Sequence, residues 1–248
     1  MTRRIAILNN NTDRSAFAQR FPDDGHKVVA ALRPLRPGWQ FDVWQARDGQ
    51  LPPSVHDYQG WLLTGSVASV NDNEPWMLQL AALVRQLHVQ RAPLVGLCFG
   101  HQMVAHALGG QVGPSPGGWR IGTAVTHYTA LLPFMQPPQS QLNLFAAHQE
   151  QVLRPPPGAR VVGGDRFAPA AALALGEHIF TSQYHPELSR EFMRALLQEY
   201  AHEWPASLVD QARVQLEEPV DAALFMRWVV QFLEQPGAPA STASSEAP

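Results

Sequence analysis

The sequence contains little cysteine and no long apolar run, and both shortages exclude whole classes of protein. A single cysteine among 248 residues cannot form an intrachain disulfide, which excludes a disulfide-rich secreted scaffold and fits a reducing compartment. The first apolar run, residues 5–8, ends at the asparagines of positions 9–11, so we expect neither a signal peptide nor a membrane span. These features favour the cytoplasm as the location.

An excess of basic charge is also missing, as is any glycine-rich phosphate loop. The 18 Lys and Arg residues against 21 Asp and Glu residues leave a net charge of −3, which gives no electrostatic argument for nucleic acid or an anionic membrane as partner. Neither a Gly-x-Gly-x-x-Gly segment nor a Walker A loop occurs, and the histidines join no metal-ligand pattern. We therefore predict neither a cofactor nor a metal.

The composition is that of a globular protein with a sizeable core, because apolar residues make up 45% and charged residues 16%. Short apolar stretches alternate with helical ones, which is typical of a mainly parallel, doubly wound α/β sheet with helices on both faces. We predict one domain over residues 1–235, with a catalytic core over about 40–195 and C-terminal helices over about 188–235. Residues 236–248 form a Pro/Ala/Ser-rich tail that we expect to be disordered.

Apolar periodicity predicts the individual elements. We expect a helix after position 98 that ends at the glycine pair 109–110, and short β-like pieces broken by Pro and Gly from 117 to about 181. The predicted strands lie at 5–8, 41–44, 60–66, 93–97, 118–125 and 171–180, and the other predicted helices at 26–32, 75–90, 188–203 and about 208–234.

The single cysteine lies in a Gly-x-Cys-x-Gly segment between a predicted strand and a predicted helix. Gly96 and Gly100 flank Cys98, a spacing typical of a nucleophile elbow, whose tight turn needs glycine and exposes one side chain at the sheet edge. The sulfur then lies at a helix N-terminus, where the dipole and free N–H groups favour thiolate over thiol. A lone cysteine is more often a small buried apolar residue, but the paired glycines favour a nucleophile.

A thiolate nucleophile for acyl transfer needs a proton-transfer partner, a group that orients this partner, and donors for the oxyanion. Of the ten histidines, His185 follows a predicted strand at the same sheet edge as the elbow, and Glu187 is placed to accept its second imidazole N–H. Gly65, after the third strand, offers an N–H for the oxyanion together with the N–H of Phe99. By spacing alone, the His-x-Glu pair and the Gly-Ser turn are also common in ordinary loops.

Together these segments resemble the class I glutamine amidotransferase family. Residues 96–102 and 107–110 resemble its nucleophile segment, residues 183–187 its His-Pro-Glu segment, and residues 63–66 its oxyanion strand. The resemblance covers about residues 40–195. It implies the flavodoxin-like fold of that family and hydrolysis of a γ-glutamyl amide through a thioester.

The resemblance also implies a role for each matching residue. Cys98 would attack the amide, His185 would transfer the proton, and Glu187 would orient His185. Gln102 would contact the γ-glutamyl group, and His148 would begin a loop whose backbone contacts the amino-acid end of the substrate.

Three further segments, at 64–66, 72–76 and 118–122, are similar to stand-alone members of the family, a branch that includes γ-glutamyl peptidases and GMP synthase-like proteins. Tyr184 stands where a glycine is frequent in the family, and we expect its bulk to narrow the pocket.

Nearby residues have more ordinary expected roles. We expect His101 to pack or hydrogen-bond beneath the elbow, and Trp76 and Trp119 to form core or pocket wall.

Three functions remain open at this point. The chain is a free-standing hydrolase of a small γ-glutamyl substrate, a glutaminase subunit that passes ammonia to a separate synthase chain, or a catalytically silent binding or regulatory protein on the same fold. A cysteine at position 98 disfavours the third function. Nothing in residues 111–170 identifies the group beyond the amide, and the sequence also leaves the oligomeric state open.

Overall fold

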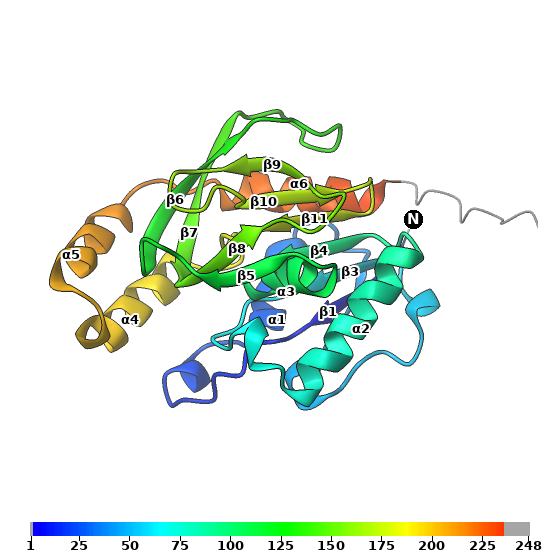
Figure 1. Cartoon of the computed structure of the whole chain (residues 1–248), viewed down its shortest axis with the longest axis horizontal. Helices are drawn as coiled ribbons and strands as arrows, with labels where there is room; N and C mark the ends of the chain where they lie inside the picture. Colours follow the sequence, from blue (N-terminus) through cyan, green and yellow to red (C-terminus); the bar gives the residue numbers. More distant parts are fainter. Residues whose placement is uncertain (1, 236–248) are drawn as a thin grey trace, which may run out of the picture.

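Most predicted helices and strands are present near their predicted bounds, and strands at 111–114, 141–148, 150–154 and 160–164 had no prediction of their own. The computed structural model describes residues 2–235 (Figure 1), so the predicted disordered tail at 236–248 lies outside the described residues. The strands are β1 (Arg4–Leu8), β2 (Gln40–Trp44), β3 (Gly60–Leu63), β4 (Leu94–Leu97), β5 (Gln111–Pro114), β6 (Arg120–Tyr128), β7 (Gln141–His148), β8 (Glu150–Arg154), β9 (Arg160–Gly164), β10 (Ala172–Leu175) and β11 (Ile179–Ser182). The helices are α1 (Asp24–Leu32), α2 (Pro75–Val89), α3 (Phe99–Ala107), α4 (Arg190–Tyr200), α5 (Ala206–Gln215) and α6 (Ala222–Glu234).

The central sheet has nine strands in the order β2-β1-β3-β4-β11-β10-β9-β6-β7. The first five of these pair in parallel, and β10, β9, β6 and β7 extend the sheet by antiparallel pairing. This arrangement confirms the predicted α/β class, while the length of the antiparallel extension was not predicted. A separate two-stranded sheet pairs β5 with β8.

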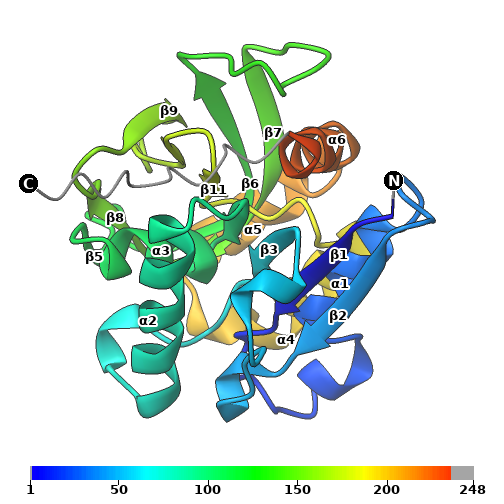
Figure 2. The same cartoon turned by 90° about the vertical axis from the view of Figure 1, so that its right-hand side faces the viewer.

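Helices cover both faces of the parallel strands, as Figure 2 shows with the sheet seen close to edge-on. On one face, α1 and α6 bury one set of strand side chains, and on the other face α2 and α3 bury the alternate set. Because both faces are covered, strands such as β3 and β4 are buried along their whole length and are nearly continuous in apolar residues.

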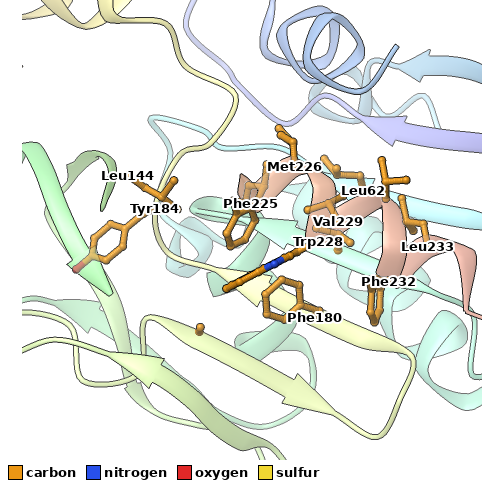
Figure 3. Packing of buried hydrophobic residues seen from close by; sticks show 14 of the residues in the cluster. Leu62, Leu144, Phe180, Tyr184, Phe225, Met226, Trp228, Val229, Phe232 and Leu233 are labelled. Atoms are coloured by element: carbon orange, nitrogen blue, oxygen red, sulfur yellow. The ribbon is translucent and has the colours of Figure 1, made fainter. Parts of the chain in front are cut away.

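The C-terminal helix α6 packs on the sheet mainly through aromatic rings. Phe180 of β11 lies among Phe225, Trp228 and Phe232 of α6 (Figure 3). The ring centroids of Phe180 and Phe225 are 5.6 Å apart, and those of Phe180 and Phe232 are 6.0 Å apart. Aromatic burial of this kind fixes α6 against the strand that leads to the predicted histidine.

Three parallel strands end side by side at one edge of the sheet. The register pairs Leu63 of β3 with Gly96 of β4, and Gly96 with Thr181 of β11. The segments that follow these strands are the predicted oxyanion turn, the predicted elbow and the His-Pro-Glu segment. The topology therefore brings the three predicted motifs to one place.

Two predicted elements are wrong in extent. The single strand predicted over 171–180 is a hairpin of β10 and β11, because Gly176 turns the chain with a φ of 54°. The long helix predicted over 208–234 is two helices, α5 and α6, and Pro219 lies in the break between them, where it has no N–H to donate to a continuing helix.

The described helices were also compared with the requirements for crossing a bilayer. Among residues 2–235, none combines the length and the apolar content that a membrane-spanning helix needs.

Candidate active site

The elbow at Cys98 has the backbone strain that its sequence pattern predicts. Cys98 joins β4 to α3 with a φ of 49° and a ψ of −103°, a conformation that residues other than glycine rarely adopt. A Cβ atom at Gly96 would lie 2.6 Å from the carbonyl oxygen of Gly100, and one at Gly100 would lie 2.5 Å from the carbonyl oxygen of Leu63. Both glycines are therefore required by close backbone approach.

The end of β11 secures the elbow and also leads to the histidine. The N–H of Cys98 donates to the carbonyl of Ser182 at 2.8 Å. His185 follows three residues later, and its N–H donates to the carbonyl of Phe145 on β7 at 2.8 Å. The histidine is thus held between the parallel strands and the antiparallel extension.

His185 and Glu187 form a buried pair next to the cysteine. His185 Nδ1 lies 2.7 Å from Glu187 Oε1, and the Glu187 side chain is fully buried. Burial of the ring alone would lower the pKa of His185, but interactions with Glu187 and with Cys98 raise this pKa well above its usual value. The arrangement favours an imidazolium whose Nδ1–H donates to Glu187 and whose Nε2–H faces the sulfur of Cys98.

Gly65 lies next to both His185 and Cys98. A Cβ atom at this position would lie 3.0 Å from Cε1 of His185 and 3.6 Å from Cβ of Cys98. Among the described residues, the N–H groups of Gly65 and Phe99 have no hydrogen-bond partner. Both N–H groups are therefore free to donate to an oxyanion, and their role stays a prediction.

A glutamine that the sequence reasoning assigned no role contacts the nucleophile. Gln183 is fully buried, and its Nε2 donates to Cys98 Sγ at 3.6 Å. Gln102 Nε2 donates to Gln183 Oε1 at 3.2 Å and to the carbonyl of Glu150 at 2.7 Å. Gln102, the predicted substrate-contacting residue, is thus held by Gln183. The signal for Gln183 in the sequence was a polar residue two positions before His185.

His148 ends β7 and lines the same cavity as Cys98. Its side chain is buried, neither ring nitrogen has a partner among the described residues, and burial lowers its pKa to about 3. A neutral ring follows from this environment. Its contact with substrate stays a prediction.

The expectation that Tyr184 narrows the pocket is wrong. Its ring belongs to the apolar core on the α6 side of the sheet (Figure 3), and its hydroxyl donates to Asp165 Oδ2 at 2.6 Å. Tyr184 lies just past the end of β11, where its ring joins the core that also holds Phe180, whereas its neighbour Gln183 contacts Cys98.

His101 and Trp76 occupy the supporting positions expected for them. His101 is fully buried, its Nδ1 lies 2.8 Å from Thr181 Oγ1, and burial lowers its pKa to about 3. Trp76 is buried and stacks on Phe99, with ring centroids 5.6 Å apart. Within residues 2–235, no group of three or more His, Cys, Asp or Glu side chains is arranged to hold a metal ion.

A cavity of about 540 Å³ opens in front of Cys98. Its lining combines polar residues near Cys98, such as Gln102 and Glu150, with residues of α4, of the segment after it and of the start of β6. The lining residues are Asp13, Ser66, Val67, Ala68, Ser69, Cys98, Gln102, Trp119, Ile121, Ala147, His148, Gln149, Glu150, Leu196, Tyr200, Glu203 and Trp204.

A family model for class-I glutamine amidotransferases matches residues 26–201. The chain belongs to this family. It is 28% identical over 202 residues to gamma-glutamyl peptidase 2 of Arabidopsis thaliana, covering 79% of this chain and 80% of that protein. It is 30% identical over 163 residues to the gamma-glutamyl-L-1-hydroxyisopropylamide hydrolase of a Pseudomonas species, covering 59% of this chain and 55% of that protein.

Two more likenesses concern a synthase and a solved structure. Over 112 residues the chain is 37% identical to a glutamine-hydrolysing GMP synthase of Aeropyrum pernix, covering 44% of this chain and 21% of that protein. The fold matches the crystal structure of a glutamine amidotransferase from Methylobacillus flagellatus with a TM-score of 0.70 and 25% identity, covering 92% of this chain and 91% of that one. These likenesses confirm the predicted family and fold.

Proposed function

We propose that the chain hydrolyses a γ-glutamyl amide through a γ-glutamyl thioester on Cys98. The observation that supports this most strongly is the buried row of Cys98, His185 and Glu187 at the ends of two adjacent parallel strands. The family of the chain and the names of its relatives support glutamine or γ-glutamyl amide hydrolysis as its general activity.

In the acylation step, the Cys98 thiolate attacks the amide carbonyl carbon, and the carbonyl oxygen becomes an oxyanion held by the N–H groups of Gly65 and Phe99. The C–N bond then breaks, and the His185 imidazolium gives its proton to the leaving amine. The high pKa of His185 keeps this proton available at neutral pH.

In the deacylation step, neutral His185 takes a proton from a water molecule, which attacks the thioester carbonyl. The C–S bond breaks, glutamate leaves, and the Cys98 thiolate and His185 imidazolium are restored. Glu187 holds the imidazole in one tautomer and stabilises its charged form throughout.

The polar end of the cavity suits the γ-glutamyl group. Glu150 lines the cavity, and its carboxylate accepts a hydrogen bond from Ser69 Oγ at 2.7 Å. A carboxylate held in this way is a counter-charge for the α-ammonium of the substrate. Gln102, fixed through Gln183, contacts the γ-carboxamide end near Cys98.

The comparisons favour a free-standing hydrolase over an ammonia-delivering subunit. The match with the peptidase covers 80% of that protein, whereas the match with the GMP synthase covers 21% of that protein. The 37% identity to the synthase segment keeps a glutaminase subunit with a separate synthase partner as the second candidate.

The test is glutamate release from glutamine and from a panel of γ-glutamyl amides and peptides, with Cys98→Ala beside the wild type. We expect the substitution to lower turnover by about 10⁴- to 10⁶-fold, because it removes the nucleophile. Thermal unfolding of both proteins checks that the variant is folded.

The other outcomes separate the candidates. A folded wild type whose Cys98 reacts with iodoacetamide but which hydrolyses no substrate contradicts the free-standing hydrolase and favours the subunit. An unreactive Cys98 in the same protein favours a catalytically silent binding protein.

A further inference from the structure

The outer half of the cavity is an apolar wall that a γ-glutamyl group alone leaves uncovered. We define this half by Trp119 and by four residues of one apolar cluster that also line the cavity, namely Ile121, Leu196, Tyr200 and Trp204. The whole cavity measures about 540 Å³, within the range of sites that hold drug-sized ligands. Space and apolar surface therefore remain beyond the scissile amide.

The wall is built from aromatic rings set at an angle to one another. The ring centroids of Trp119 and Trp204 are 5.8 Å apart at an interplanar angle of 58°, and those of Tyr200 and Trp204 are 6.4 Å apart at 52°. Trp204 is 9% exposed and packs in the cluster formed by α4 and α5, so it is held firmly, while Trp119 keeps 37% of its surface exposed. Such tilted rings leave a face and an edge for another ring to contact.

The charge of the cavity is of one sign. Its acidic lining residues are Asp13, Glu150 and Glu203, and no Lys or Arg is among the lining residues in the part of the chain that the structure describes. The arginines near the lining residues are engaged elsewhere. Arg14 pairs with Asp48 and Arg20 with Glu199. Arg120, which lies opposite His148 in the strand register, donates to the carbonyl of Thr123 and lies over the ring of Phe167. A leaving group with its own carboxylate meets repulsion here and finds no cationic side chain among the described lining residues.

We propose that the outer half of the cavity is a leaving-group subsite for an apolar, ring-bearing amine without a carboxylate, so that γ-glutamyl arylalkylamides are the preferred substrate class. The inference rests on the proposed function, because the amine leaves only when Cys98 takes the γ-glutamyl group. The C–N bond breaks, the amine departs with the proton of His185, and water releases glutamate in the second step.

A matched pair of substrates tests the charge of the leaving group. γ-Glutamylphenethylamide and γ-glutamylphenylalanine differ only in one carboxylate, and glutamine lacks the ring. We expect kcat/KM for the phenethylamide to exceed that for γ-glutamylphenylalanine by at least about tenfold. Equal or faster cleavage of γ-glutamylphenylalanine would overturn the inference.

The same series distinguishes the failure of the inference from the failure of the proposed function. Turnover of glutamine with poor turnover of both ring-bearing substrates overturns only the leaving-group subsite. Turnover of none of them by a folded wild type overturns both.

Two variants assign the preference to the wall. Glu203→Gln should raise the rate on γ-glutamylphenylalanine relative to the phenethylamide several-fold, whereas Glu177→Gln, an exposed carboxylate in the β10–β11 turn at the far end of β11, should leave this ratio unchanged. Trp119→Ala should lower the phenethylamide-to-glutamine ratio of kcat/KM about tenfold, and Trp119→Phe should restore much of it. Unchanged ratios in both Glu203→Gln and Trp119→Ala would overturn the inference.

Discussion

The parallel and antiparallel halves of the sheet contribute different parts of one cavity. The ends of the parallel strands β3, β4 and β11 lead to Gly65, Cys98 and His185, where backbone and side-chain atoms approach so closely that glycine is required. On the side of the antiparallel strands, Trp119 before β6 and Trp204 after α4 meet through their rings, with centroids 5.8 Å apart. The first half has geometry that a single methyl group would disturb, and the second half has a surface that side chains can reshape.

This difference indicates that the parallel half carries the chemical step and that the aromatic wall sets the preference between substrates. The N–H of His185 donates to the carbonyl of Phe145 and joins the two halves, but neither Trp119 nor Trp204 contacts Cys98, His185 or Glu187 through a hydrogen bond among the described residues. Changes in the parallel half should therefore slow every substrate alike, whereas changes in the aromatic wall should alter the ratio between substrates. The predictions below test this separation, beginning with the largest effect.

Glu187→Gln should slow hydrolysis of every amide by about 10²- to 10⁴-fold, because it removes the group that orients and charges His185. The carboxylate raises the pKa of His185, so its loss lowers that pKa. Since the imidazolium proton is lost as pH rises through this pKa, the alkaline limb of kcat/KM should move to lower pH. The measurement is the pH profile with glutamine and with a ring-bearing amide.

Glu177→Gln is the control for this change, since it removes the same charge from an exposed turn. Two results would contradict the assignment of Glu187 to the parallel half. One is an alkaline limb that does not move in Glu187→Gln, and the other is a loss of activity confined to one substrate.

Gln183→Leu should lower kcat/KM about tenfold for glutamine and for ring-bearing amides alike, corresponding to about 1.4 kcal/mol for a lost buried hydrogen bond. The variant removes the donor to Cys98 Sγ and the acceptor for Gln102. The pH dependence of Cys98 alkylation by iodoacetamide gives a readout that a merely structural role would leave unchanged.

Gln86→Leu, on the exposed face of α2, is the matched control for that variant. Gln183→Leu could instead change the ratio of kcat/KM between substrates and leave the pH dependence of Cys98 alkylation unchanged. Gln183 would then act with the aromatic wall, which would contradict its assignment to the parallel half.

Cys98→Gly should be more stable than Cys98→Ala, because glycine adopts a φ of 49° without strain. We expect a difference of about 1 kcal/mol in unfolding free energy, or a Tm higher by about 2–4 °C. Thermal unfolding followed by circular dichroism measures it. As a control, Ala195→Gly within α4 should lower the Tm, because glycine disfavours a helix. A lower Tm for Cys98→Gly than for Cys98→Ala would contradict the backbone strain at Cys98.

Much of the parallel half could be predicted from the sequence because its constraints are local or follow from strand direction. The Gly-x-Cys-x-Gly spacing predicted the elbow that Gly96 and Gly100 make possible, and the common edge of parallel strands brought His185 to it. The contact of Gln183 with Cys98 was not predicted, since it depends on a side-chain direction across two strands.

The aromatic wall was harder to predict from the sequence, because residues after α4 meet a residue before β6 only once the chain has folded. Trp119 was expected to be core or pocket wall, yet its partner Trp204 carried no motif. Two missed boundaries did have local signals, namely Gly176 in the turn between β10 and β11 and Pro219 in the break between α5 and α6.

The most direct test of the separation measures glutamate release from glutamine and from γ-glutamylphenethylamide by the wild type, Cys98→Ala and Trp119→Ala in parallel. The account predicts that Cys98→Ala loses both activities, whereas Trp119→Ala mainly loses the activity on the phenethylamide. Retained release by Cys98→Ala, or an equal loss of both activities in folded Trp119→Ala, would contradict it.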